Sequence, residues 1–245
     1  MSDSPAKRPV RPPGAGHVRA EGARLDPARP SAGVEQVRRL LRKEYGPRRW
    51  QPRQDPLSEL MAVVLSQNTS DVNSHRAFAA LVDRFGSWED AAAADAGEIA
   101  RAIRAGGLAD IKAARIKAIL GEIRARWGRL DLGFLGDMDL NEAKAWLREL
   151  PGVGPKTAGC VLLFSLGRPA MPVDTHVYRV ARRLGLIDAR ASVEKAHDVL
   201  EALVPPENVY EVHMLLVEHG RRTCKAQRPR CAACVLRGMC PGAAV

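Results

Sequence analysis

The chain of 245 residues is poor in aromatic side chains and has no long apolar run. Phenylalanine, tryptophan and tyrosine together make up 4% of it, although 46% of its residues are hydrophobic. The longest apolar runs, such as residues 60–65 and 158–164, are far too short to span a bilayer. Charge and proline occupy the first residues, where a signal peptide would carry an apolar segment. We therefore expect a cytosolic protein that does not enter a membrane and, in that reducing compartment, forms no disulfides.

Acidic residues are scarce relative to basic ones. The 28 aspartates and glutamates are outnumbered by 38 lysines and arginines, which gives a formal net charge of +10 and an isoelectric point near 9.8. This balance favours a polyanionic partner over an acidic small substrate. Nucleic acid is the first candidate, which would place the protein at the nucleoid, and an anionic membrane surface is the competing one. Residues 1–30 hold six prolines, six basic residues and no aromatic residue, which predicts a disordered basic tail.

Strand patterns are also absent. No segment shows sustained alternation of apolar and polar residues, whereas many segments repeat apolar residues at helical spacing. This spacing predicts a helix from Val34 to Tyr45, ended by Gly46 and Pro47, and a largely apolar, buried helix that begins at Pro56. The sequence therefore predicts an all-α fold of about ten helices.

A glycine-rich turn joins two helical patterns in the segment Leu150-Pro-Gly-Val-Gly-Pro-Lys-Thr-Ala158. Gly152 and Gly154 both permit a positive φ, and we expect both to adopt it. Because they lack Cβ atoms, a phosphate could approach the backbone N–H groups at the start of the second helix. Gly152, Val153 and Gly154 are therefore a candidate phosphate-binding hairpin, although the glycines alone are also compatible with an ordinary turn between helices.

Cysteines are few, and four of the five lie close together near the end of the chain, at Cys224, Cys231, Cys234 and Cys240. Four soft ligands within seventeen residues can surround one metal centre. The residue types alone leave structural zinc and an iron–sulfur cluster both open. The fifth, Cys160, lies in an apolar helical pattern and is expected in the core.

The hairpin and a later Val173-Asp-Thr-His176 segment resemble the helix-hairpin-helix DNA glycosylases, most closely the endonuclease III family. The resemblance covers most of residues 55–240, and all three intervals between the four cysteines match that family's C-terminal iron–sulfur loop. It implies a six-helix, barrel-like domain at residues 55–165 that contains the hairpin. A second helical domain, residues 34–54 with 166–245, would carry a [4Fe-4S] cluster held by the four cysteines. DNA would bind in the cleft between these domains.

The resemblance also implies a catalytic pair, which falls on Lys156 and Asp174. The Lys156 amine would attack C1′ of a flipped nucleotide and form a Schiff base, with Asp174 assisting electrostatically and in proton transfer. A lysine directly after the hairpin implies a bifunctional enzyme, which removes the base and then cleaves the strand by β-elimination. Oxidised pyrimidines in duplex DNA are the implied substrates, and a monomer is the implied state.

Three further residues receive DNA-contact roles from the same resemblance, and a lysine that follows one of them suits a fourth contact. Either Gln67 or Asn68 would fill the space that the flipped nucleotide leaves, although capping of the next helix could explain the polar residues of this loop. Leu108 would wedge into the base stack, and Lys112 would contact a phosphate.

Two other functions remain compatible with the sequence. A mismatch glycosylase would share the whole framework, and the Gln67-Asn68-Thr69 loop indicates that the substrate range could differ from the family norm. A non-catalytic helix-hairpin-helix module would share the basic charge and the hairpin, but would have no need for Asp174 or the cysteine loop.

Overall fold

The computed structural model describes residues 33–243, so the predicted tail at residues 1–30 lies outside it. Within that range the chain is helical throughout, with no strand, which confirms the all-α prediction. The α-helices are α1 (Val34–Tyr45), α2 (Pro56–Ser66), α3 (Asp71–Phe85), α4 (Trp88–Ala93), α5 (Ala96–Ala102), α6 (Ala109–Trp127), α7 (Leu140–Arg148), α8 (Pro155–Leu166), α9 (Thr175–Arg183), α10 (Val193–Leu203) and α11 (Val209–Arg222). Short 3-10 helices are η1 (Arg104–Gly106), η2 (Gly133–Gly136), η3 (Pro206–Asn208), η4 (Cys231–Ala233) and η5 (Arg237–Met239).

Local signals fix the ends of the helices that build the site. Asp55 accepts a hydrogen bond from the Ser58 N–H at 2.9 Å, and Pro56 supplies the first residue of α2. Ser70 caps α3 in the same way, through the Asn73 N–H. These caps place the polar residues 66–70 in a loop between α2 and α3.

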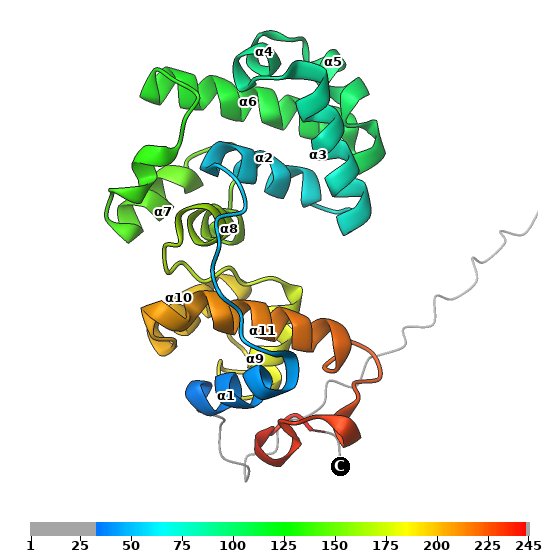
Figure 1. The fold of residues 1–245 in the computed structure, drawn as a ribbon, viewed down its shortest axis with the longest axis vertical. Coiled ribbons are helices and arrows are strands. Elements are labelled where there is room, and N and C mark those ends of the chain that lie inside the picture. The colour runs from blue at the N-terminus through cyan, green and yellow to red at the C-terminus, as the bar shows by residue number, and fades with distance from the viewer. Residues whose placement is uncertain (1–32, 244–245) are drawn as a thin grey trace, which may run out of the picture.

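Two groups of buried side chains divide the described chain into two lobes (Figure 1). Helices α2 to α7 enclose the first group, and α1, α9, α10 and α11 enclose the second with the C-terminal segment. Helix α8 lies between the lobes and serves both, because Ala158 and Leu162 belong to the first group and Leu163 and Phe164 to the second. The boundaries predicted for the two domains stay a prediction.

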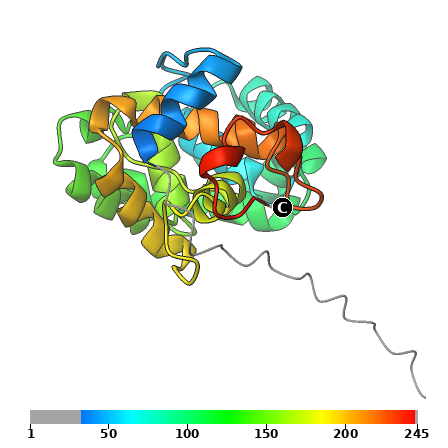
Figure 2. The same cartoon turned by 90° about the horizontal axis from the view of Figure 1, so that it is seen from below.

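Residues 46–55 connect the lobes by running from α1 in the lower lobe of Figure 1 to α2 in the upper lobe. The connector is fastened to α8: the Trp50 Nε1–H donates to the Leu163 carbonyl at 2.7 Å, and the Arg53 N–H donates to the Phe164 carbonyl at 3.2 Å. Seen from below, α1 and the C-terminal segment lie side by side (Figure 2). The first helix and the C-terminal segment therefore both belong to the second lobe.

Across residues 33–243, none of the helices combines the length and the apolar character needed to cross a bilayer.

Candidate active site

An open cleft with a volume of about 510 Å³ lies between the two lobes. Its walls come from the connector, α2, α3, α8 and α11, together with the residue before α9. Lys156 and Asp174, eighteen positions apart in the sequence, both line it. The structure therefore brings together the two residues predicted to act as a pair.

Each of the two residues sits at the start of a helix. Lys156 follows Pro155 in the first turn of α8 and is half-buried. Asp174 is the N-cap of α9, where its Oδ1 accepts from the Val177 N–H at 2.7 Å. Because both helix N-termini open on the cleft, their dipoles make it favourable for negative charge, as on a phosphate or a departing base.

The hairpin between α7 and α8 differs from the sequence prediction in one respect. Gly152 has φ +72°, but Gly154 has φ −96° and ψ −179°, so only one of the two glycines uses the left-handed region. Both are exposed, and the space where a Cβ of Gly154 would stand is open to 4 Å. The prediction for Val153 needs correction, because its side chain is buried and its N–H donates to the Leu150 carbonyl at 3.1 Å. The exposed glycines therefore remain as the candidate phosphate contacts.

In the loop before α3, the neighbouring residues Gln67 and Asn68 have different environments. The Gln67 Oε1 accepts a hydrogen bond from Arg115 Nη1, and the Arg115 side chain also covers Gly152 of the hairpin. Asn68 is exposed and holds a left-handed φ of +54°, a conformation that costs energy for a residue other than glycine. The loop therefore ties Gln67 to the hairpin side of the structure and presents Asn68 to solvent.

Leu108 combines exposure with backbone strain. Its side chain is 51% exposed, its φ is +51°, and Ile111 beside it is 59% exposed. Together with Asn68 and Arg228 it completes the set of non-glycine residues with positive φ in the described chain. Exposed apolar groups held on a strained turn are suited to enter a base stack.

Lys112 is not placed as predicted. It is 2% exposed, and its Nζ donates to the carbonyls of Leu65 at 2.8 Å and of Gly106 at 2.9 Å. Burial lowers the pKa of this ammonium. A side chain enclosed in this way cannot reach a phosphate, so we correct its role to joining the end of α2 to η1.

Several cleft residues were missed from the sequence, among them Glu59 and His213. Glu59 was identifiable in principle, because it is the only charged residue of the apolar helix PLSELMAVVLS and a buried charge is rare without a partner. His213 gave no comparable signal, because its neighbours in α11 do not show that it turns toward Asp174.

His213 is buried and acts as a neutral ring. Burial lowers its pKa to about 4. Its Nδ1 lies 3.0 Å from the Pro172 carbonyl, and because a carbonyl can only accept, Nδ1 carries the proton. The ring also packs against Phe164 in a T-shaped contact with centroids 5.4 Å apart. This arrangement fixes the loop that leads to Asp174.

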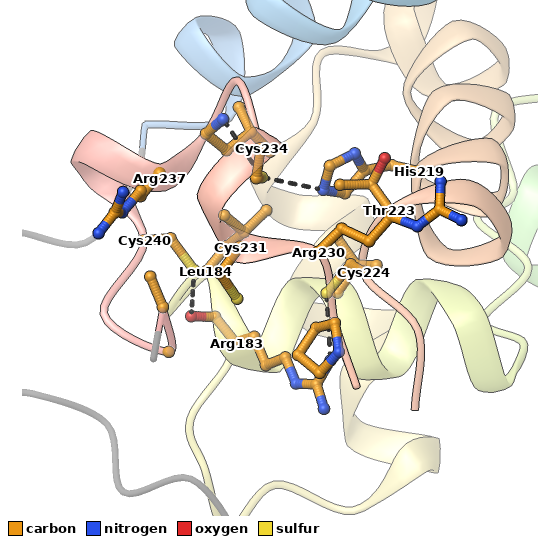
Figure 3. Close-up of a pocket in the computed structure, with 15 residues that line it drawn as sticks. Arg183, Leu184, His219, Thr223, Cys224, Arg230, Cys231, Cys234, Arg237 and Cys240 are labelled. Carbon is orange, nitrogen blue, oxygen red and sulfur yellow. Dashed lines mark hydrogen bonds between the residues drawn. The ribbon is translucent and has the colours of Figure 1, made fainter. Parts of the chain in front are cut away.

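The four C-terminal cysteines line one small cavity in the second lobe (Figure 3). Leu184 and Leu236 close its apolar side, and burial raises the pKa of Cys240 to about 11. Two neighbouring groups donate to the sulfur atoms, and a histidine ring nitrogen lies close to one of them. Arg183 Nη1 lies 3.3 Å from the Cys224 Sγ, the Leu236 N–H lies 3.4 Å from the Cys234 Sγ, and His219 Nε2 lies 3.6 Å from the same sulfur.

Cys160, expected in the core, is 4% exposed in α8 and is separate from this group.

Comparisons with known proteins agree on the family. The sequence profile of the HhH-GPD superfamily of base excision DNA repair proteins matches residues 61–206. Endonuclease III of Thermotoga maritima is 36% identical over 186 residues, which cover 76% of this chain and 83% of that protein. A DNA glycosylase homologue of Arabidopsis thaliana is 42% identical over 165 residues, which cover 67% of this chain but only 56% of the plant protein.

Solved structures give the same match. A non-covalent endonuclease III–DNA complex superposes with a TM-score of 0.73 at 30% identity, over 86% of this chain and 97% of that one. A trapped covalent endonuclease III–DNA intermediate superposes with a TM-score of 0.72 over the same shares. A thermostable thymine-DNA glycosylase, at 20% identity and a TM-score of 0.68, shares the fold.

Proposed function

The chain belongs to the HhH-GPD superfamily of base excision DNA repair proteins and is a DNA glycosylase, and we propose that it removes oxidised pyrimidines from duplex DNA and then cleaves the strand at the abasic site. The observation that carries this proposal is the meeting of Lys156 and Asp174 in one cleft, each at a helix N-terminus. A module that only bound DNA would not need this pair.

In the proposed reaction the neutral Lys156 amine attacks C1′ of the flipped nucleotide. The bond from C1′ to the base breaks, and the base leaves with the bonding electrons and takes up a proton. The sugar ring then opens to give an imine between Nζ and C1′, and loss of a C2′ proton breaks the bond from C3′ to its oxygen. These steps account for both base removal and strand cleavage with one nucleophile.

Asp174 supports these steps with its carboxylate. One oxygen is engaged by the Val177 N–H, and the second is the oxygen that can stabilise the positive charge on the sugar and accept a proton. The N-cap hydrogen bond holds the carboxylate in place, so little reorganisation is needed when charge develops.

The loops around the cleft mouth supply the proposed DNA contacts. We assign the gap left by the flipped nucleotide to Asn68, because it is exposed while Gln67 is held by Arg115. Leu108 would enter the base stack, and the amides of Gly152 and Gly154 would bind a phosphate.

The four cysteines suit a [4Fe-4S] cluster better than zinc. A tetrahedral zinc site has Zn–S bonds of about 2.3 Å, which requires the thiols to crowd around a single ion. The four thiols line one cavity, and the intervals between the cysteines match the iron–sulfur loop of the endonuclease III family, which is the reason to assign a cluster instead of zinc. A bound cluster would supply four iron–sulfur bonds that fasten residues 224–240 to the second lobe.

Borohydride trapping on abasic duplex DNA tests the proposed function. Borohydride reduces the imine to a stable bond, so the wild-type protein should become covalently attached to the strand. Lys156→Gln should not be trapped, whereas Lys195→Gln, an exposed lysine of α10 outside the cleft, should be trapped as efficiently as wild type. Absence of trapping in the wild type would contradict the lyase proposal and favour a glycosylase that uses water or a binding module.

A further inference from the structure

Glu59 places a carboxyl group in the wall of the cleft that holds Lys156 and Asp174. It lies in the first turn of α2, among apolar residues, and is 4% exposed. Moving a carboxylate out of water is unfavourable unless other groups compensate for the lost hydration. The contacts of Glu59 therefore show what the site is arranged to hold.

Two donor-bearing side chains from the connector flank this carboxyl group. The Gln54 Nε2–H donates to Glu59 Oε2 at 3.1 Å. Arg53 Nη1 lies 3.9 Å from Glu59 Oε1, at the outer limit of an ion pair. The Arg53 guanidinium is held in place by stacking on Phe164, with 3.7 Å between its central carbon and the ring centroid.

These contacts leave hydrogen-bonding capacity unused. An ionised carboxylate can accept about four hydrogen bonds, and an amide NH2 and a guanidinium carry several donors each. Burial raises the pKa of Glu59, and the positive charge of Arg53 and the hydrogen bond from Gln54 limit this rise. The cleft wall thus presents a donor, an acceptor and a donor in a row, from Arg53, Glu59 and Gln54.

We propose that Arg53, Glu59 and Gln54 read the pairing edge of the flipped base and select pyrimidines that carry an imide. The imide edge of a uracil- or thymine-type ring is an acceptor, a donor and an acceptor, namely O2, N3–H and O4, which complements the order in the wall. A cytosine-type ring presents O2, N3 and an amino group, so its N3 lone pair would face the Glu59 carboxylate. The inference rests on the proposed function, because it concerns the base that is released when Lys156 attacks C1′ of the flipped nucleotide.

Three duplexes separate recognition of the base from the steps that act on the sugar. The first contains dihydrouracil, which has the imide, and the second contains 5-hydroxycytosine, which lacks it. The third contains an abasic site, which has no base. Wild type should excise dihydrouracil faster than 5-hydroxycytosine. Glu59→Gln should lower dihydrouracil excision by about tenfold or more, which corresponds to one lost hydrogen bond to a charged group. Cleavage at the abasic site should stay within about twofold, because no base remains to be read.

Two further variants keep the test decisive. Glu89→Gln, an exposed glutamate of α4, should match wild type on all three duplexes. Gln54→Leu removes a flanking donor and should reduce the preference for dihydrouracil, even if Glu59→Gln folds poorly. An equal fall on all three duplexes, or no change on any, would overturn the proposal. Failure of wild type to cleave abasic DNA would instead refute the lyase proposal while leaving the base preference measurable by release of the free base.

Discussion

Asp174 has two tasks that depend on different properties of its side chain. The N-cap of α9 needs only an oxygen that accepts from the Val177 N–H, whereas stabilising charge on the sugar needs a negative charge. Asparagine is as good an N-cap as aspartate, but it is neutral. The two tasks can therefore be separated by substitution.

We expect Asp174→Asn to lower lesion turnover by a factor on the order of hundreds, in line with the loss of one preorganised charge-stabilising group, while the unfolding midpoint changes little. Asp174→Ala should lose turnover and also about 1 kcal/mol of stability, because the cap is lost as well. Abasic-site cleavage should suffer less than base removal in both variants. Single-turnover rates and denaturant melts measure these effects, and unchanged turnover in Asp174→Asn would refute the catalytic assignment.

His213 links the cleft to the pH dependence of stability. Its folded pKa of about 4 lies below the ordinary value of 6.5, so between these values the unfolded chain binds more protons than the folded one. The stability associated with the neutral ring is therefore fully present above pH 6.5 and is lost as the pH falls toward 4.

Compared with His213→Asn, the wild type should lose additional stability on acidification from pH 7 to 4, on the order of 2 kcal/mol. Asparagine is chosen because its amide can still donate to the Pro172 carbonyl. Urea melts across this range measure the difference between the two proteins. Parallel pH profiles would show that His213 does not titrate in the way its burial implies.

At the scale of elements, the two glycines of the hairpin between α7 and α8 have different roles. A Cβ on Gly152 would lie 2.4 Å from Arg115 Nε and would require a left-handed backbone, whereas the corresponding space at Gly154 is open. The fold therefore requires glycine at position 152. The proposed phosphate contact requires glycine at position 154, because the phosphate must approach the backbone there.

Gly154→Ala should weaken binding to abasic duplex DNA by several-fold, with an unfolding midpoint close to that of wild type. Gly152→Ala should lower the stability by about 1 kcal/mol or more, because alanine is strained at positive φ. Fluorescence anisotropy and thermal melts give the two quantities for each variant. If Gly154→Ala bound DNA as wild type does, the hairpin would be an ordinary turn.

The sequence predicted those elements for which periodicity and end signals agree. Helix α2 carries both an apolar pattern and a proline at its first residue, and the α7–α8 hairpin carries its glycines. The role of Lys112 could not be predicted, because a lysine on a helix is normally solvated and only the fold places the Leu65 and Gly106 carbonyls at its Nζ.

The same limit applies to the cleft wall. Lys156 and Asp174 were found because motifs mark them, whereas no motif marks Arg53 and Gln54. They reach Glu59 only because Trp50 and Arg53 bind carbonyls of α8 that lie more than a hundred residues away in the sequence. No local pattern encodes a contact of that separation.

At the scale of the whole molecule, the site draws residues from both lobes and from the helix between them. Lys156 comes from the helix shared by both lobes, and Asp174 begins a helix of the second lobe, whose C-terminal segment holds the four cysteines. Asp71 of α3 and Arg221 of α11 form an ion pair of 3.0 Å across the cleft, which joins the lobes at a second point. Disorder of the C-terminal segment around the cysteines should therefore also disturb the active site.

Cys231→Ser should lose iron, together with the broad absorbance near about 400 nm that iron–sulfur charge transfer gives, and should be less soluble than wild type. Cys160→Ser is the matched control, because Cys160 lies outside the cysteine cavity, and it should keep both signals. Elemental analysis and absorbance spectra measure the outcome. Stoichiometric zinc with little iron in the wild type would contradict the proposed cluster.

The central claim is that the Lys156 amine forms the bond to C1′, and mapping the trapped bond tests it most directly. The borohydride-reduced complex with abasic DNA is digested with protease and nuclease, and mass spectrometry locates the peptide that carries the sugar remnant. We predict the remnant on Lys156, in the peptide that spans the hairpin and the start of α8. A remnant on any other lysine or on the N-terminal amine, with Lys156 unmodified, would contradict the account.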